Sequence, residues 1–459
     1  MNILQQLNDI FTPERVLTDE DSLQNYGKDW TQVYTPDPLA IVFPTSTEEV
    51  QALVKMANEE GVALVPSGGR TGLCGGAVAM NQEIVVSFDR MNKILDFNSI
   101  DRSVVCQPGV ITQQLQNFAE ENNLFYPVDF GSSGSSQLGG NISTNAGGIK
   151  VVRYGLTRNW VLGLKVVTGA GEVLDLNHGL VKNATGYDFR HLFIGAEGTL
   201  GFITEATMRL TNIPKNLTVF VLGVTDIPAL MQVFETFQNT IELSAFEFFS
   251  EDTLSLMVND KGYARPFDTE APYYALIQFE VDHESKEESA LQAFEACAEE
   301  GWVVDGVMSQ SLQQAKDLWR LREDISETIS AYTPYKNDLS VNISKVPEYL
   351  DKVEQAVNQN YSEFKVLWYG HIGDGNLHLN ILKPESMEVS EFFEQCSKVN
   401  PDIFEVTKEM NGSVSAEHGI GIIKKNYLKY SRSKEEVELM ASVKKIFDPN
   451  GIINPGKIF

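Results

Sequence analysis

Cysteine is scarce in this chain, and no apolar run is long enough to cross a membrane. The four cysteines among the 459 residues form no C-x-x-C pair; they are Cys74, Cys106, Cys297 and Cys396. This pattern favours a reduced cytoplasmic protein, with the cysteines as small buried side chains, over a disulfide framework. Residues 1–12 are polar and lack the apolar core of a signal peptide. We therefore expect a soluble, cytoplasmic protein without a membrane span.

Basic residues are also in short supply. The chain has 36 Lys and Arg against 63 Asp and Glu, which gives a formal charge of -27 and an isoelectric point near 4.6. This charge argues against nucleic acids and anionic membranes as partners. It would also repel an anionic substrate, so a local group of basic side chains, amides or a metal ion must reverse the sign where such a substrate binds. The length predicts two or three domains.

Two common nucleotide-binding motifs are absent, although glycine is frequent. Neither G-x-G-x-x-G nor G-x-x-x-x-G-K-[ST] occurs, which argues against nicotinamide or nucleoside triphosphate binding on the usual folds. Glycines gather instead at residues 67–76, 131–148 and 195–201. The first group follows a predicted buried strand, residues 63–66, and its bare backbone amides suit phosphate oxygens. The alternative is that these glycines are only structural turns.

Short helices and strands alternate along the chain. A capping box, Ser46 to Glu49, begins a helix whose apolar residues recur with a helical period until Gly61. The pattern also predicts strands at 124–128, 162–167 and 202–210, and helices at 285–300, 309–330 and 433–447. The dipeptide Ile213-Pro214 indicates a domain boundary.

Three of the six histidines lie in two polar, glycine-rich motifs: His371 and His378 within residues 370–380, and His418 beside Glu417. The turn-forming run 373–376 predicts strands at 368–372 and 377–381. On the second strand, alternation puts His378 and Asn380 on one face. Two imidazoles and a carboxylate would suit Zn²⁺ or a similar divalent ion and leave a coordination position open. The alternative is a set of histidines that make only ordinary hydrogen bonds.

Seven motifs, in this order, resemble the flavin-dependent D-2-hydroxyacid dehydrogenases of the vanillyl-alcohol oxidase type over nearly the whole chain. They are P-S-G-G-R-T-G-L from residue 66, D-F-G-S-S-G-S-S-Q-L-G-G-N-I-S-T-N-A-G-G from 129, A-T-G-Y-D-F from 184, G-A-E-G-T-L-G from 195, G-H-I-G-D-G-N-L-H-L-N from 370, A-E-H-G-I-G from 416 and F-D-P-N-G-I-I-N-P-G-K from 447. Within the family they look most like bacterial members that act on D-2-hydroxyglutarate, with D-lactate and glycolate dehydrogenases as neighbours.

The resemblance implies an α+β fold with noncovalent FAD. It implies a two-part FAD-binding domain of the vanillyl-alcohol oxidase/PCMH type (residues 1–213), an α+β substrate-binding cap domain (214–410) and a C-terminal segment (411–459) that completes the active site. Its implied cofactor contacts are Pro66, Ser67, Gly68, Gly69, Arg70, Thr71, Gly72, Pro127, Gly131, Ser132, Gly139, Asn141, Thr144, Gly147, Gly148, Ile203 and Asn454. Some members attach flavin through a histidine in the first loop, where this chain has none.

The same resemblance implies a role for each candidate residue of the active site. The metal ligands would be His371, His378 and Glu417, and His418 would be the general base. A 2-hydroxy acid would chelate the metal through its hydroxyl and carboxylate, while hydride leaves Cα for flavin N5. Arg322, Ser326 and Lys336 would hold the distal carboxylate of a diacid, with Ser326 where a threonine often occurs; Asn380 could hold the proximal carboxylate.

The implied activity is therefore metal-dependent oxidation of D-2-hydroxyglutarate to 2-oxoglutarate. Electron-transfer flavoprotein or a quinone would accept the electrons, and the resemblance suggests a homodimer. One alternative is a D-lactate or other D-2-hydroxyacid dehydrogenase, which should not need two cations for a second carboxylate. Another is an oxidase, and a third is a flavin-binding protein without turnover, which has no use for an open metal position beside a base.

Overall fold

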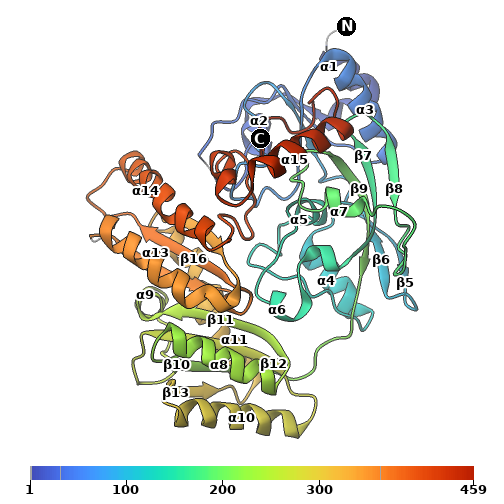
Figure 1. Cartoon of the computed structure of the whole chain (residues 1–459). Coiled ribbons are helices and arrows are strands. Elements are labelled where there is room, and N and C mark those ends of the chain that lie inside the picture. The colour runs from blue at the N-terminus through green and yellow to red at the C-terminus, as the bar shows by residue number, and fades with distance from the viewer. Residues whose placement is uncertain (1–2, 32, 362) are drawn as a thin grey trace. The chain divides into compact units, whose positions relative to one another are not determined.

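The computed structural model describes residues 3–31, 33–361 and 363–459, and the chain forms two compact units (Figure 1). Unit 1 comprises Met1–Gly148, Gly155–Ile213 and Glu417–Phe459. Unit 2 comprises Ile149–Tyr154 and Pro214–Ala416. Each unit combines helices with sheets, and in the part of the chain described no helix is both long and apolar enough to cross a membrane. All four cysteines are buried, as expected.

Unit 1 contains a small sheet in the order β1-β2-β4-β3, in which β2 and β3 run parallel to β4. Its strands are Val16–Leu17 (β1), Ala40–Val42 (β2), Leu64–Ser67 (β3) and Ile84–Ser87 (β4). The apolar face of helix α3 (Thr47–Glu60) packs against this sheet in one hydrophobic core. As predicted, Ser46 accepts the Glu49 N–H at the start of α3, and Gly61 ends the helix with φ +67°. The Glu49 carboxylate binds Arg15 and the Thr45 N–H instead of completing the capping box.

The second sheet of unit 1 is antiparallel, in the order β5-β6-β9-β7-β8. Its strands are Ile94–Asn98 (β5), Ser103–Cys106 (β6), Val161–Thr168 (β7), Val173–Leu176 (β8) and Gly201–Arg209 (β9), which confirms the predicted strands at 162–167 and 202–210. The strand predicted at 124–128 is wrong. Only Phe125 forms a bridge, to Thr211, because Pro127 has no N–H with which to continue a ladder.

The remaining helical segments of unit 1 surround the two sheets. They are α1 (Ile3–Ile10), α2 (Glu20–Tyr26), α4 (Thr112–Glu121), α5 (Leu138–Thr144), α7 (Arg190–Phe193), the predicted tail helix α15 (Lys434–Phe447), and the 3₁₀ turns Pro13–Arg15, Thr157–Asn159 and Lys425–Tyr430. The tail returns to the first sheet: the Leu64 N–H donates to Ile452 O at 2.8 Å, and the Asn454 N–H donates to Leu64 O at 2.7 Å. Strand β3 is thus completed by a segment from the far end of the described chain.

Unit 2 is built on a seven-stranded sheet in the order β13-β10-β12-β11-β15-β16-β14, with antiparallel neighbours. The strands are Leu217–Val224 (β10), Leu243–Ser250 (β11), Tyr273–Glu280 (β12), Val303–Met308 (β13), Tyr335–Ser340 (β14), Lys365–Gly370 (β15) and Asn376–Leu382 (β16). Its helical segments are α6 (Val151–Tyr154), α8 (Ile227–Thr240), α9 (Glu251–Lys261), α10 (Glu284–Glu299), α11 (Leu312–Glu323), α12 (Ile325–Ser330), α13 (Val346–Asn360), α14 (Val389–Glu409) and the 3₁₀ turns Ile343–Lys345 and Ile372–Asp374.

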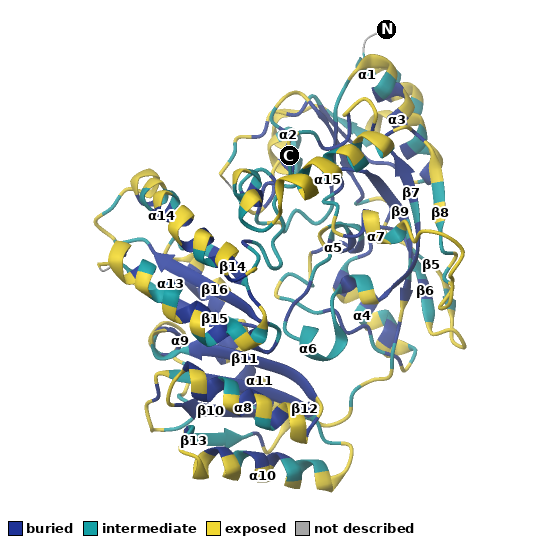
Figure 2. Ribbon diagram, viewed as in Figure 1, coloured by how far each residue is buried: buried dark blue, intermediate teal, exposed yellow. Residues whose placement is uncertain are grey.

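Both faces of the unit 2 sheet are covered, so its strands are largely buried (Figure 2). One face packs against α9, α11 and α12 in a single apolar core. On the other face, Phe220 of β10 contacts Phe237 of α8 and Phe294 of α10. The helix predicted at 309–330 is two helices, α11 and α12, which meet at Asp324. Asp324 has ψ near 0°, and its carboxylate accepts a hydrogen bond from Tyr263. Aspartate is a poor helix former, which favours a break at this position.

Candidate active site

A cavity of about 970 Å³, including space open to solvent, opens where β3 ends in unit 1. We call it the unit 1 cavity. Its lining includes these predicted cofactor residues: Pro66, Ser67, Gly68, Gly69, Arg70, Thr71, Gly72, Gly139, Asn141, Thr144 and Ile203. His418 lines the same cavity. Residues from four distant parts of the sequence therefore share one concave surface.

The walls of this cavity suit an anionic, phosphate-bearing group. A Cβ at Gly69 would lie 2.2 Å from Ser135 O, so only glycine lets the first two glycine-rich loops come this close. A Cβ at Gly140 would meet nothing, so bare backbone faces open space there. The buried Ser67 hydroxyl has no hydrogen-bond partner among residues 3–31, 33–361 and 363–459. Exposed amides and an unused buried hydroxyl are the groups that phosphate oxygens engage, so the residues fit the FAD diphosphate.

Six of the predicted cofactor residues lie outside this lining: Pro127, Gly131, Ser132, Gly147, Gly148 and Asn454. Asn454 instead supports the walls. It is fully buried, and its Nδ2 donates to the backbone oxygens of Gly76, at 3.0 Å, and Glu197, at 2.9 Å. Its contribution in this structure is to shape the cavity.

The carboxylate of Glu197 holds the loop that carries His418. It accepts the backbone N–H groups of Ile420 and Gly421, each at 2.7 Å. Cys74 binds the same loop, because its Sγ donates to Gly419 O at 3.1 Å and its carbonyl accepts the Ile422 N–H at 2.9 Å. Burial raises the pKa of Glu197, although the two amides oppose this. The third glycine cluster therefore fixes the backbone next to His418.

Replacing Glu197 with alanine is expected to loosen this loop. A hydrogen bond to a charged acceptor contributes about 1.5–3 kcal/mol, so the amides of Ile420 and Gly421 should exchange with deuterium about 10- to 100-fold faster. Mass spectrometry of peptides covering residues 417–424 measures this. Glu205→Ala, which removes a partly exposed partner of Lys165, is the control and should leave exchange unchanged. Unchanged protection in Glu197→Ala would contradict the role of the carboxylate.

In unit 2, His371 and His378 lie on either side of a tight turn. His371 follows β15, and His378 lies on β16, where it pairs with Tyr369. Gly375 closes the turn with φ +83°, and a Cβ there would lie 2.1 Å from Val341 O. The predicted strand pair is confirmed, with bounds shifted by a few residues: His371 lies outside the strand, at φ -88° and ψ 66°.

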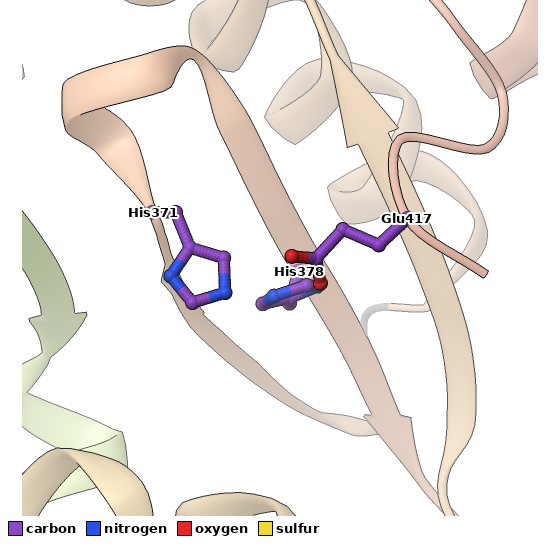
Figure 3. Close-up of side chains that lie close together, drawn as sticks. All are labelled: His371, His378 and Glu417. Carbon is purple, nitrogen blue, oxygen red and sulfur yellow. The ribbon is translucent and has the colours of Figure 1, made fainter. Parts of the chain in front are cut away.

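The carboxylate of Glu417 completes a group with these two histidines (Figure 3). Glu417 is one peptide bond beyond Ala416 of unit 2, whose N–H donates to Asp338 O at 3.2 Å. One ligand atom from each of His371, His378 and Glu417 lies within 4.8 Å of the others, and the three side chains point toward a common centre. We call them the histidine-glutamate group. Two nitrogens and a carboxylate oxygen so arranged fit a divalent ion.

Acidic residues surround this group. Asp338, fully buried on β14, lies 3.7 Å from His378 Nδ1 and accepts from Asn376 Nδ2 at 2.9 Å. Glu247 on β11 lies 2.8 Å from His371 Nδ1. Burial, with the charges of Glu247 and Asp338, raises the pKa of Asp374 to about 6, although His371 opposes the shift. This concentration of carboxylates is favourable only if positive charge is nearby.

Basic side chains supply that charge in the same unit. Arg322 of α11 is 4% exposed; its Nη2 lies 2.8 Å from Glu247 Oε2, and its guanidinium lies over the Tyr369 ring at 4.7 Å. Lys336 of β14 donates to Ser326 Oγ at 3.1 Å. Lys336 also pairs across the sheet with Asn380, whose side chain is buried. The structure therefore brings Lys336 together with both Ser326 and Asn380, and holds Arg322 beside Glu247.

Two family models match this chain. The FAD binding domain matches residues 38–177, and the C-terminal domain of FAD linked oxidases matches residues 213–458. The chain belongs to the FAD-linked oxidase family. D-2-hydroxyglutarate dehydrogenase of Stutzerimonas stutzeri (strain A1501) is 60% identical over 457 residues, 100% of this chain and 98% of the relative. The enzyme of the same name from Xanthomonas citri pv. viticola is 52% identical, over 97% and 94% of the two chains. This family member is an FAD-dependent dehydrogenase.

Solved structures show the same fold at low identity. p-Cresol methylhydroxylase superposes with a TM-score of 0.77 at 15% identity, covering 99% of this chain and 96% of the other. 4-Ethylphenol oxidase from Gulosibacter chungangensis also gives 0.77, at 18% identity, covering 100% and 96%. The predicted fold class and the predicted FAD cofactor of this FAD-linked dehydrogenase are confirmed.

Three acidic residues of the dehydrogenase escaped sequence reasoning. Asp29 and Glu197 line the unit 1 cavity, and Glu247 contacts His371. Asp29 had no signal beyond its acidic side chain. Glu197 lies in the motif G-A-E-G-T-L-G, and an acidic residue between glycines was the signal that could have indicated its role. Glu247 lies among the apolar residues of β11, where an isolated acid in a buried strand is itself a signal of function.

Proposed function

We propose that this dehydrogenase oxidises D-2-hydroxyglutarate to 2-oxoglutarate with a divalent ion, Zn²⁺ or a similar metal, held by His371, His378 and Glu417. The observation that carries the proposal is the pairing of this group with a buried arginine, Arg322, and a half-buried lysine, Lys336, in a protein of charge -27. A substrate with a carboxylate at each end needs both features. The curated relatives that bear the name of this activity support the choice of substrate.

The proximal end of the substrate would bind beside the histidine-glutamate group. His371, His378 and Glu417 would hold the metal, which when bound would supply a Lewis acid that the substrate hydroxyl and carboxylate chelate and that lowers the hydroxyl pKa. Asn380 on β16 would orient that carboxylate through its amide. His418 would take the hydroxyl proton on a ring nitrogen. Its position in the lining of the unit 1 cavity, on a loop clamped by Glu197, supports this role.

FAD, when bound in the unit 1 cavity, would supply the hydride acceptor, flavin N5. The loop from Pro66 to Gly72 would hold its diphosphate through backbone amides and the Ser67 hydroxyl. Noncovalent attachment remains our proposal, as do transfer of electrons to electron-transfer flavoprotein or a quinone, a cytoplasmic location and a homodimer. The absence of a histidine from the first glycine loop supports noncovalent attachment, and the scattered cysteines support the cytoplasmic location. The resemblance to the family supports the electron acceptor and the homodimer.

The distal carboxylate would bind to Arg322, Ser326 and Lys336. Arg322 Nε has no hydrogen-bond partner among the described residues, although it is buried, which favours an anionic ligand at this position. The Ser326 hydroxyl already lies beside Lys336 Nζ. One cation with a fork of donors and one point charge would together hold a carboxylate.

Anaerobic mixing of the yellow protein with substrates tests the proposal. D-2-hydroxyglutarate should bleach the oxidised-flavin band much faster than L-2-hydroxyglutarate or D-lactate. Bleaching should stop with a chelator and return with Zn²⁺. Bleaching by D-lactate at least as fast would favour the monoacid enzyme, and no bleaching by any hydroxy acid would favour a binding protein without turnover.

Lys336→Met is expected to change substrate preference. Loss of the cation should raise KM for D-2-hydroxyglutarate about 100-fold, because a charge-assisted hydrogen bond contributes about 1.5–3 kcal/mol. KM for D-lactate, which has no distal carboxylate, should change less than about threefold. Steady-state kinetics of both substrates measure this. Lys383→Met is a suitable control, because its Nζ donates to the backbone oxygens of Pro384 and Met387 in its own loop. Equal losses for both substrates would contradict the assignment.

The diacid KM is also expected to depend on pH through Lys336. Burial lowers the pKa of Lys336 from the ordinary lysine value of 10.5. Below the lowered pKa the side chain is charged and binds a carboxylate; as pH rises through it, the free site loses that charge. KM for D-2-hydroxyglutarate should therefore rise in this alkaline range, while KM for D-lactate stays flat. In Lys336→Met the rise should disappear.

A further inference from the structure

The carboxylate of Glu247 joins the first histidine of the histidine-glutamate group to Arg322. Glu247 lies in the interior of β11 and is 1% exposed. Its Oε2 lies 2.8 Å from His371 Nδ1 and 2.8 Å from Arg322 Nη2, while its Oε1 lies 2.9 Å from the same histidine nitrogen. A carboxylate this deeply buried is costly unless it is paired, and here it has two partners.

The contact with His371 decides which ring nitrogen carries the proton. A neutral imidazole has one N–H, and a carboxylate beside Nδ1 places the proton there. The other nitrogen, Nε2, then keeps its lone pair. In Figure 3 this nitrogen of His371 points toward His378 and Glu417. The ring is thus turned so that its unprotonated nitrogen faces the centre of the group.

The contact with Arg322 fixes the cation relative to that same ring. Arg322 Nη2 is a close ion partner of Glu247 without the alignment of a good hydrogen bond, and the Tyr369 ring supports the guanidinium at 4.7 Å. Arg322 Nε remains without a hydrogen-bond partner in the described part of the chain. One carboxylate therefore holds His371 on one side and Arg322 on the other, and leaves the arginine a donor to spare.

We propose that Glu247 is a positioning residue that sets the tautomer of His371 and the position of Arg322. It thereby fixes the distance between the two sites that bind the carboxylates of the substrate. This inference rests on the proposed function. If Glu247 only stabilised the fold, its removal would leave metal affinity and relative substrate preference unchanged in molecules that remain folded. Both quantities can be measured.

Titration of the FAD-loaded, metal-free protein with Zn²⁺ by calorimetry is the first test. Glu247→Gln keeps the side-chain shape, but its amide can present an N–H to His371 and favour the wrong tautomer. The Zn²⁺ Kd should rise about 10- to 100-fold, the range expected when an outer partner of a metal ligand is lost. Glu247→Asp should recover part of the affinity. The control is Glu280→Gln, which removes a 2.8 Å partner of Arg153 in the same unit and should bind Zn²⁺ like the wild type.

The second test separates the two contacts. At saturating Zn²⁺, Glu247→Gln should raise KM for D-2-hydroxyglutarate about tenfold more than KM for D-lactate, because only the diacid uses Arg322. Wild-type protein labelled with ¹⁵N-histidine provides a measurement without mutation. The His371 signal, identified by its loss in His371→Ala, should show the Nδ1-protonated tautomer. The Nε2-protonated tautomer would overturn the proposal even if the variants failed to fold.

Failure of this inference can be told apart from failure of the proposed function. If His371→Ala binds Zn²⁺ as the wild type does, the metal is not held there and the proposed function is lost. If His371→Ala loses Zn²⁺ while folded Glu247→Gln binds it within twofold of the wild type, only the role of Glu247 is lost. A Kd raised in Glu247→Gln and also in Glu280→Gln would reduce the effect to one of general stability.

Discussion

Removal of the metal is expected to slow flavin reduction by D-2-hydroxyglutarate at least about 1000-fold, since a Lewis acid that stabilises an alkoxide contributes several kcal/mol to the barrier. His378→Ala should have a comparable effect and should bind less Zn²⁺, because we propose that His378 is one of the three ligands in the histidine-glutamate group. Anaerobic stopped-flow absorbance measures the reduction rate, and elemental analysis measures the metal content.

The matched control for this prediction is His191→Ala. That side chain is about half exposed, and its ion pair with Asp188 is long, at 3.6 Å. The variant should keep its metal and its reduction rate. If the metal-free protein reduces its flavin at the wild-type rate, His371 and His378 are not catalytic metal ligands and make only ordinary hydrogen bonds. Restoration by Mg²⁺ but not by Zn²⁺ would instead leave the site in place and correct the identity of the ion.

His418→Ala is expected to slow flavin reduction by about 100- to 10,000-fold at neutral pH, the usual contribution of a positioned general base. FAD content and Zn²⁺ affinity should change little, because His418 lies outside the glycine clusters at residues 67–76, 131–148 and 195–201 and is not a member of the histidine-glutamate group. In the wild type the rate should rise with pH as the base loses its proton. In the variant the rise near neutral pH should disappear, and the rate should rise only at alkaline pH, where hydroxide removes the substrate proton.

Two measurements decide the assignment of His418. Substrate Kd, obtained from the concentration dependence of flavin reduction, should remain within about tenfold of the wild type, because a general base acts mainly in the chemical step. A large loss of substrate affinity with an unchanged limiting rate would make His418 a binding residue. An unchanged pH profile would remove it from the chemistry, and Asp338, which can join Glu417 and His418 in one group, would be the next acid to replace.

Local signals in the sequence predicted the elements that depend on local interactions. Ser46 and Gly61 limit α3 through a side-chain cap and a left-handed residue, which are properties of those residues alone. The turn around Gly375 likewise predicted the β15–β16 pair. The fold class and the FAD cofactor followed from seven ordered motifs, which the comparisons bear out. The domain limits and the roles of the site residues remain predictions.

The partners of the site residues could not be predicted in this way. Glu247 and His371 are 124 residues apart, and Glu197 and Ile420 are 223 residues apart, so nothing in their sequence neighbourhoods indicates contact. At the break between α11 and α12, Asp324 accepts a hydrogen bond from Tyr263, which lies in another segment of the chain. The failed strand at 124–128 has the composition of a strand, but Pro127 and the absence of a longer partner stop it at one bridge.

The hydrogen bonds of Leu64 with residues 452 and 454 have a consequence for synthesis of the protein on the ribosome. Strand β3 leads directly into the first glycine loop, yet one edge of it stays unpaired until residues 452–454 have been translated. Contacts so distant along a chain form slowly, and unpaired strand edges invite aggregation meanwhile. The first sheet of unit 1 can therefore be completed only after all of unit 2 has been translated. Truncation before residue 450 should yield insoluble polypeptide, with the loss falling on unit 1.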